Sequence, residues 1–66
     1  MAENSIFADF NNIGGDNRTI TLRKFAEKPE QIREGKLVIA KDSDYQCYAT
    51  VTKLWDDGTV ELLLDM

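Results

Sequence analysis

The stretch TKLWDDGTVEL, residues 52–62, decides the fold because it contains the clearest turn signal in the chain. Asp56-Asp57-Gly58 separates two runs in which apolar and polar residues alternate, and this pattern is typical of a β-hairpin. The length of the loop sets the strand register, and a shift of one residue moves every side chain to the opposite face of the sheet. The register therefore decides whether Trp55, the only tryptophan, lies in the core or outside it.

A two-residue loop, Asp57-Gly58, is one solution. It would place Trp55 opposite Val60 on the inner face, and it would bury Lys53 among apolar side chains opposite Leu62. An unpaired buried lysine costs roughly several kcal/mol or loses its charge, although its long side chain can extend the ammonium group to water. In this register the indole ring belongs to the core.

A three-residue loop, residues 56–58, is the other solution. A type I turn would end with Gly58 in the left-handed conformation and form a bulge. The cross-strand pairs would be Leu54 with Val60, Lys53 with Glu61, and Thr52 with Leu62. A cross-strand charge pair contributes up to about 1 kcal/mol, and no lysine is buried. This register is therefore preferred, and it turns Trp55 outward, either free for a partner or half exposed over an open end of a barrel.

The same period of two predicts further strands on both sides of the hairpin. Residues 5–12 and 18–25 alternate around the loop IGGDN, and we expect these two segments to form a first hairpin. Residues 36–42 contain the compact apolar run LVI and are expected to form a largely buried strand. With residues 45–55 and 59–65, the prediction is a mainly β domain of five strands.

One short helix is expected after the second strand. Pro29 suits the first position of a helix, and Gly35 suits the residue just past its end. The six or so residues between them are too few for a stable free helix. One to two turns are expected, held to the core by Ile32.

From Gly35 to Asp65 the chain resembles the small SH3-like barrels, and among them the Tudor type most closely. The matching features are Gly35 before KLVIAKD, an acidic turn, CYATV with its small alternating residues, and DDGTVELLLD. The resemblance implies a five-stranded SH3-like small barrel in which the N-terminal strands close the sheet. Tudor-like domains commonly bind methylated lysine or arginine in an aromatic cage. Here Lys41 follows Ala40, and LLLD lacks the usual aromatic residue, so that activity is not carried over.

The whole chain also resembles short bacterial proteins that open with an ADFN-type strand and carry an IREG-type helix end. That resemblance implies a free-standing protein and no particular chemistry.

Composition predicts a single globular domain, residues 1–66, in which 42% of residues are apolar and 30% charged. Eight basic residues against twelve acidic ones give a net charge of −4, which argues against binding to a phosphate backbone. The chain has no histidine and one cysteine, Cys47, so the usual catalytic triads and zinc sites cannot be built. We expect no enzyme activity, no cofactor and no metal. Without a signal peptide or a long apolar run, we expect a cytoplasmic protein that does not enter a membrane.

Protein recognition is the function that these observations leave. We expect a non-enzymatic adaptor or regulatory module that binds another protein, or a second copy of itself, through an exposed aromatic and apolar patch. The candidate binding residues are Trp55, Leu63, Tyr45 and Phe7, while Tyr48 is expected inside with Leu54. The alternative is a protein that binds RNA or single-stranded DNA by stacking bases on its aromatic residues, against the repulsion of the neighbouring aspartates.

Overall fold

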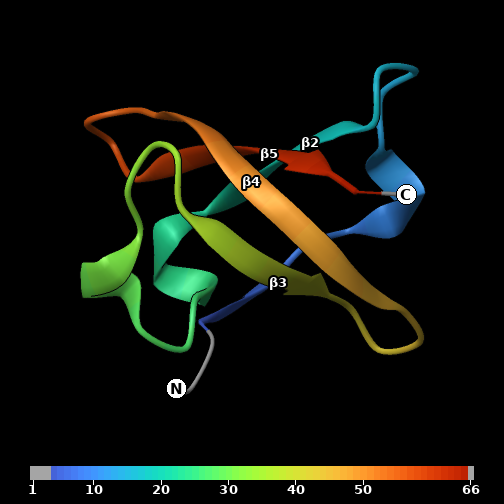
Figure 1. Ribbon diagram of the computed structural model, residues 1–66, viewed down its shortest axis with the longest axis horizontal. Coiled ribbons are helices and arrows are strands. Elements are labelled where there is room, and N and C mark those ends of the chain that lie inside the picture. Colours follow the sequence, from blue (N-terminus) through green and yellow to red (C-terminus); the bar gives the residue numbers. More distant parts are fainter. Residues whose placement is uncertain (1–3, 66) are drawn as a thin grey trace.

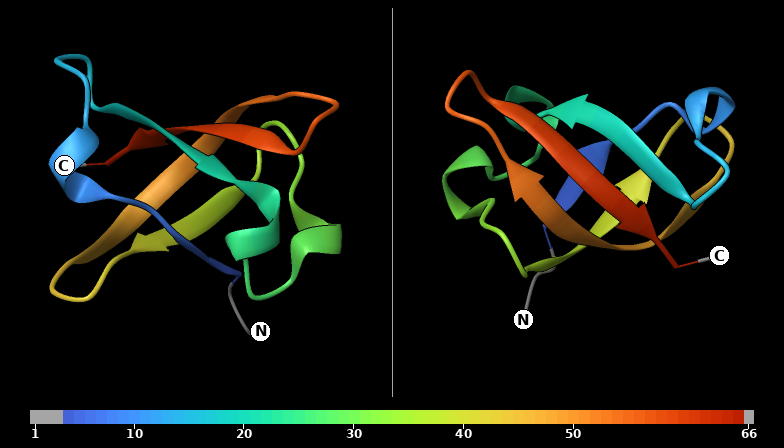
Figure 2. Two further views of the ribbon diagram at one scale, coloured as in Figure 1. Left: turned by 180° about the vertical axis from the view of Figure 1, so that it is seen from behind. Right: turned by 90° about the horizontal axis from the view of Figure 1, so that it is seen from above.

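The computed structural model describes residues 4–65, which form a mainly β structure with one curled sheet of five strands, a half-barrel (Figure 1). The strands are β1 (Ser5–Phe7), β2 (Arg18–Leu22), β3 (Leu37–Lys41), β4 (Gln46–Leu54) and β5 (Thr59–Leu64). Their order in the sheet is β1-β3-β4-β5-β2. Curling brings the two end strands, β1 and β2, to face each other across a seam (Figure 2).

The expected hairpin between the first two strands is wrong. β1 pairs in parallel with β3, with Ile6 opposite Ala40, and β2 pairs antiparallel with β5, with Thr21 opposite Val60. β1 ends early because the Asp9 side chain accepts a hydrogen bond from the Asn11 backbone N–H, which starts a 3-10 turn at residues 10–12. Ten residues, 8–17, connect β1 to β2. So long a connection does not hold two strands in a tight hairpin.

In residues 4–65, β1 and β2 are not paired in a ladder, and the Thr21 side chain bridges the seam between them. The Thr21 hydroxyl donates a hydrogen bond of 2.6 Å to the Phe7 carbonyl. Beyond it, residues 23–28 cover the free edge of β1, where Ile6 pairs with Ala26 and the Glu27 N–H donates to the Ser5 carbonyl at 2.7 Å. The end of β1 is therefore held by this segment, which is why the sheet curls almost into a barrel.

The Asn4 side chain holds residues 23–28 in place through two hydrogen bonds to the Lys28 backbone. Its amide donates to the Lys28 carbonyl at 2.9 Å, and its side-chain oxygen accepts the Lys28 N–H at 3.0 Å. Asn4 is only 8% exposed, and a buried polar group of this kind is tolerated because both of its functions are satisfied. The pair of bonds fixes the loop to the start of the sheet.

The expected single helix is also wrong, because the segment forms two 3-10 turns, η2 (Arg23–Phe25) and η3 (Pro29–Gln31). Pro29 does start its turn, Ile32 is buried, and Gly35 takes the left-handed conformation with φ +89°. The segment is too short to repay the cost of helix nucleation. Within residues 4–65, no helix has the length and apolar character needed to cross a membrane.

The core lies inside the curl of the sheet. Fully buried alanines at positions 8, 40 and 49 leave little side-chain volume between facing strands, so the sheet can curl tightly. In β2 the threonines face inward and Ile20 faces out, 48% exposed. The other core residues are Ile6, Ala26, Ile32, Val38, Val51, Val60, Leu62 and Leu64.

The β4–β5 hairpin has the three-residue loop. The Gly58 N–H donates to the Trp55 carbonyl at 3.0 Å, and Gly58 has φ +93°. The pairs Leu54–Val60 and Lys53–Glu61 are confirmed. Trp55 is 39% exposed, so the preferred register correctly placed the indole ring outside the core.

A bulge at Thr52 changes the register farther along the hairpin. Leu62 lies opposite Val51, not opposite Thr52 as expected. The Thr52 hydroxyl instead donates to Glu61, at 2.8 Å to its carboxylate. The extra residue lets both Val51 and Leu54 point inward, although strict alternation over the three steps from 51 to 54 would place them on opposite faces. Tyr48, expected inside with Leu54, is therefore outside and 46% exposed, because it lies on the other side of the bulge.

Gly58 is expected to be sensitive to substitution. A Cβ atom there would meet nothing within 4 Å, so the cost of Gly58→Ala is conformational, about 1–2 kcal/mol of unfolding free energy for a side chain held at positive φ. Gly15→Ala is the control, because Gly15 is equally open and lies outside the left-handed region. Urea denaturation followed by circular dichroism measures both, and equal stability of the two variants would contradict the turn geometry.

Candidate functional site

Four large apolar side chains share the outer face of the sheet across three neighbouring strands. Ile39 of β3 lies opposite Tyr48 of β4, and Thr50 lies between Leu37 of β3 and Leu63 of β5. Leu37 is 60% exposed, Tyr48 46% and Leu63 36%, while Ile39 is half-buried. We call Leu37, Ile39, Tyr48 and Leu63 the sheet patch.

The sheet patch arises because β3 is apolar on both of its faces. Val38 and Ala40 point into the core, and Leu37 and Ile39 alternate with them on the outside. A strand of this kind is typical of sheets that are covered on both sides. Within residues 4–65 no element covers the outer side, so the apolar face meets solvent.

Charged residues border the sheet patch on one side. Lys53 lies opposite Glu61, and Arg18 lies opposite Leu63, with its Nε 3.7 Å from the Glu61 carboxylate. An apolar centre with a polar rim is the composition of a protein-binding surface. The rim also carries both signs of charge, which would orient a partner.

The structure separates the four binding residues expected from the sequence. Leu63 belongs to the sheet patch. Phe7, 50% exposed, lies at the seam, where its ring packs edge-on against Phe25 at 6.0 Å between centroids. Trp55 and Tyr45 flank opposite ends of the nine-residue strand β4, about 25–30 Å apart along the strand.

The rings of Trp55 and Tyr45 each contact a different side chain. The Lys53 ammonium lies 5.8 Å from the centre of the indole ring, and the Tyr45 ring lies 6.2 Å from that of Phe10. Tyr45 is 67% exposed. These two residues are therefore separate exposed aromatics, and of the expected set only Leu63 joins the sheet patch.

Sequence reasoning missed three members of the sheet patch: Leu37, Ile39 and Tyr48. The signal was present in KLVIAKD, because the residues that alternate to one face, Leu37 and Ile39, and those that alternate to the other, Val38 and Ala40, are all apolar. Reading that run as a buried strand assumed a cover for its second face.

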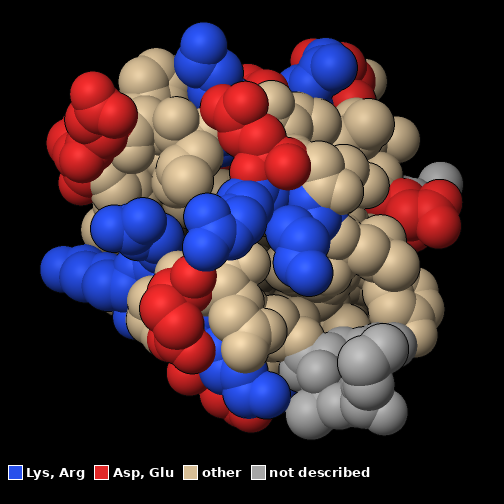
Figure 3. Space-filling view, turned by 60° about the vertical axis from the view of Figure 1, so that its left-hand side comes forward, with Lys and Arg blue, Asp and Glu red and all other residues tan. Residues whose placement is uncertain are grey.

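Lys and Arg side chains, interspersed with Asp and Glu, are visible on the face of the molecule shown in Figure 3. Five of the eight basic residues lie in residues 23–36, which we call the basic segment, together with three acidic ones. They are Arg23, Lys24, Lys28, Arg33 and Lys36. Among residues 4–65 both ion pairs involve Arg18, so the basic segment keeps its charges free of direct carboxylate partners.

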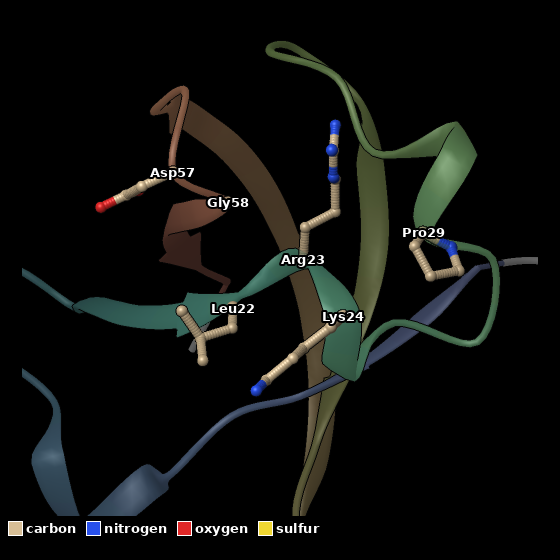
Figure 4. A pocket seen from close by; sticks show the side chains of 6 residues that line it. All are labelled: Leu22, Arg23, Lys24, Pro29, Asp57 and Gly58. Atoms are coloured by element: carbon tan, nitrogen blue, oxygen red, sulfur yellow. The ribbon is translucent and has the colours of Figure 1, made fainter.

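One cavity lies beside the basic segment but does not form a convergent site. It has a volume of about 460 Å³ and is lined by Leu22, Arg23, Lys24, Pro29, Asp57 and Gly58. The Arg23 and Lys24 side chains point in different directions, and Asp57 points away from both (Figure 4). An anion in this cavity would not be held by both cations at once.

The aspartates of the loops are occupied as turn formers. Asp42 accepts hydrogen bonds from the backbone N–H groups of Asp44 and Tyr45, which lower its pKa. Hydrogen bonds from the Thr59 side chain and backbone likewise lower the pKa of Asp57. Each carboxylate is thus kept ionised by its own turn, which is unlike a proton-transferring carboxyl whose pKa is raised.

Cys47 also lacks the surroundings of a reactive thiol. Burial raises its pKa, and the nearby Asp65 carboxylate acts in the same direction, whereas nucleophilic cysteines have lowered pKa values. In residues 4–65 no three His, Cys, Asp or Glu side chains are grouped to hold a metal ion.

Comparisons of the chain with models of protein families, with curated proteins and with solved structures gave no match.

Proposed function

We propose that this protein is a non-enzymatic recognition module that binds another protein through the sheet patch. The observation that carries the proposal is the continuity of Leu37, Ile39, Tyr48 and Leu63 over three adjacent strands. Contiguous exposed apolar surface mostly marks interaction sites in soluble proteins. Scattered single apolar residues would need no such explanation.

Tyr48 is the anchor of this surface. Tyrosine is enriched among the residues that dominate binding energy, because it offers a large rigid ring with a polar end. Leu37 and Leu63 lie on either side of Thr50 and extend the apolar area. The partner is expected to present a flat apolar surface, such as one face of an amphipathic helix or of a second sheet.

The proposal includes an SH3-like architecture and a cytoplasmic location. The five strands, the antiparallel run β3–β4–β5 and the end strands that approach each other at the seam support an SH3-like barrel. A single half-buried cysteine agrees with a reducing compartment.

Nucleic-acid binding is the second candidate, and the basic segment is the observation that favours it. Five cations without ion pairs in one stretch of fourteen residues could follow a phosphate backbone. The net charge of −4 opposes it. Retention on single-stranded RNA that weakens steeply with salt would support this candidate.

The test compares three baits in affinity capture from the native cell extract: wild type, Leu37→Ser/Tyr48→Ser, and Trp55→Ala. Both changes in the double variant lie on the solvent side of the sheet, so its melting curve should stay close to that of wild type. A partner of the sheet patch should be depleted at least tenfold by the double variant and retained by Trp55→Ala. Direct titration of the recovered partner then measures the affinities.

Two results would count against the sheet patch. If Trp55→Ala abolishes capture while the double variant does not, the partner binds at the hairpin end. If all three folded baits recover the same proteins in equal amounts, the exposed apolar face has no recognition role.

A further inference from the structure

The turn of the β4–β5 hairpin contains the one Asp-Gly pair of the chain, Asp57-Gly58, and the sequence has no Asn-Gly pair. In such a pair the backbone nitrogen of the glycine can attack the aspartate carboxyl group, because glycine has no side chain to hinder the approach. Asp57 is exposed to water and Gly58 is half-buried. The loop therefore holds the groups needed for a spontaneous rearrangement of the main chain.

The rearrangement needs no reactant other than water. The Gly58 nitrogen bonds to Cγ of a protonated Asp57, and the N–H proton and the carboxyl OH leave together as water, which closes a succinimide ring. Water then opens the ring at either of its carbonyl carbons. Opening at Cγ restores aspartate. Opening at the main-chain carbonyl carbon of Asp57 leaves isoaspartate, in which the chain continues through Cβ and Cγ.

The folded turn opposes the attack at the nitrogen. The Gly58 N–H donates to the Trp55 carbonyl at 3.0 Å, and the Trp55 N–H donates to the Thr59 carbonyl at 2.9 Å. The first bond holds the proton that must leave, and the second closes the hairpin next to it. Loss of the Gly58 proton would leave the Trp55 carbonyl without this donor, which costs stability in the folded state.

The turn also keeps the Asp57 carboxyl group in its unreactive form. The Asp57 Oδ1 accepts the Thr59 N–H at 2.9 Å. Hydrogen bonds from the Thr59 side chain and backbone lower the pKa of Asp57, and an ionised carboxylate has no OH group to lose. Such a bond to the backbone two residues ahead also restricts the aspartate side chain. Both partners of the reaction are therefore held back by the same loop.

We infer that Asp57-Gly58 is a site of isoaspartate formation that the hairpin turn protects, so that the reaction proceeds when the turn opens. Parts of a protein open locally at a lower free energy than global unfolding. A slow reaction of the open form follows the population of that form. The inference does not depend on the sheet patch or on a partner.

Isoaspartate at position 57 would alter the hairpin itself. It adds one main-chain carbon to a loop whose length sets the strand register. The pair Leu54–Val60 and the hydrogen bond between Trp55 and Thr59 depend on that length. The rearranged chain is therefore expected to lose the end of the hairpin and to melt at a lower temperature than the original chain.

Incubation of the whole chain at one pH and temperature, folded in buffer and unfolded in guanidinium chloride, tests the inference. Peptides that contain residue 57 are separated, and their fragment ions distinguish aspartate from isoaspartate. Isoaspartate at this position should accumulate about tenfold or more faster in the unfolded chain. Water labelled with ¹⁸O adds a count of every ring opening.

Thr59→Val measures the contribution of the hydroxyl group that holds Asp57. The change keeps a branched side chain at position 59, so isoaspartate formation should speed up severalfold in the folded chain and stay the same in the unfolded chain. Thr50→Val is the matched control, because Thr50 lies in β4 away from the loop, and neither rate should change. Circular dichroism confirms that both variants are folded.

Asp57→Asn measures the contribution of the nitrogen. An amide leaves as ammonia and needs no protonated carboxyl group, so the ionisation of residue 57 no longer protects the chain. Deamidation should still be slower in the folded chain than in the unfolded chain, because the Gly58 N–H keeps its bond to Trp55. The ratio of the two rates should be smaller than that of the wild type.

Equal rates of isoaspartate formation in the folded and unfolded wild-type chain would overturn the inference, and so would its absence from the unfolded chain. This comparison stands even if Thr59→Val does not fold. If Thr59→Val folds and reacts at the same rate as Thr50→Val, the turn does not protect the site through Thr59, and the inference is wrong. None of these results changes the expected capture of a partner by the sheet patch, so the two proposals fail separately.

Discussion

Replacing Leu62 with alanine is expected to remove a large part of the unfolding free energy of the protein at 25 °C. Leu62 is 0% exposed and lies opposite Val51 in the middle of the core. A buried leucine truncated to alanine costs about 2–5 kcal/mol, through lost burial and the cavity left behind. A 66-residue chain has a total stability of only about 3–10 kcal/mol, so this single change removes much of it.

Leu63→Ala is the matched control, because the neighbouring leucine points outward and is 36% exposed. Its truncation should cost less than about 1 kcal/mol. Guanidinium denaturation monitored by circular dichroism compares the two variants. If Leu63→Ala proved the more damaging change, the inner and outer faces of β5 would have been assigned the wrong way round.

Asn4→Ala is expected to cost about 2 kcal/mol of unfolding free energy. The change removes both hydrogen bonds to Lys28, and a buried backbone group left without a partner costs about 1–3 kcal/mol. The segment that covers the edge of β1 should loosen with it. Hydrogen exchange at the Lys28 and Glu27 amides should therefore accelerate more than exchange in β4.

Ser5→Ala provides the comparison for Asn4. Ser5 is equally buried at 8%, but its hydroxyl makes only a long contact of 3.4 Å to Glu27. It should lose a few tenths of a kcal/mol. Equal losses in the two variants, with unchanged exchange at Lys28, would show that the bonds from Asn4 do not hold this loop.

The β4–β5 hairpin could be predicted because its determinants are local. Asp56-Asp57-Gly58 specifies the loop, and the cost of burying Lys53 selects the register, which the pair Lys53–Glu61 confirms. The turn at Pro29 and the positive φ at Gly35 follow from the same kind of short-range rule. Each of these features depends on residues that lie only a few positions apart in the sequence.

The pairing of β1 could not be predicted from local patterns. Its partner β3 lies more than thirty residues away, and Ile6 would fit a parallel or an antiparallel neighbour equally well. What fixes the arrangement is the Asn4–Lys28 contact and the cover provided by residues 23–28. Neither has a sequence signature, because the Asn4–Lys28 contact joins residues that are 24 positions apart in the chain.

The candidate site was found only in part for a similar reason. Leu63 was expected outside because it follows directly from the hairpin register. Tyr48 was placed inside because strict alternation was carried through Thr52, where the ladder holds one residue too many. Leu37 and Ile39 were assigned to a buried strand since an apolar run alone does not reveal which face is covered.

Because Thr52 is the extra residue of the bulge, β4 can lose one residue there without a change in the pairing on either side. Two residues separate Val51 from Leu54, while a single residue separates their partners Leu62 and Val60. A gene that lost the codon for Thr52 would encode a strand with equal counts on both sides, and the core residues and Trp55 would keep their places. Loss of this one residue would therefore not exchange the interior of the protein for its surface.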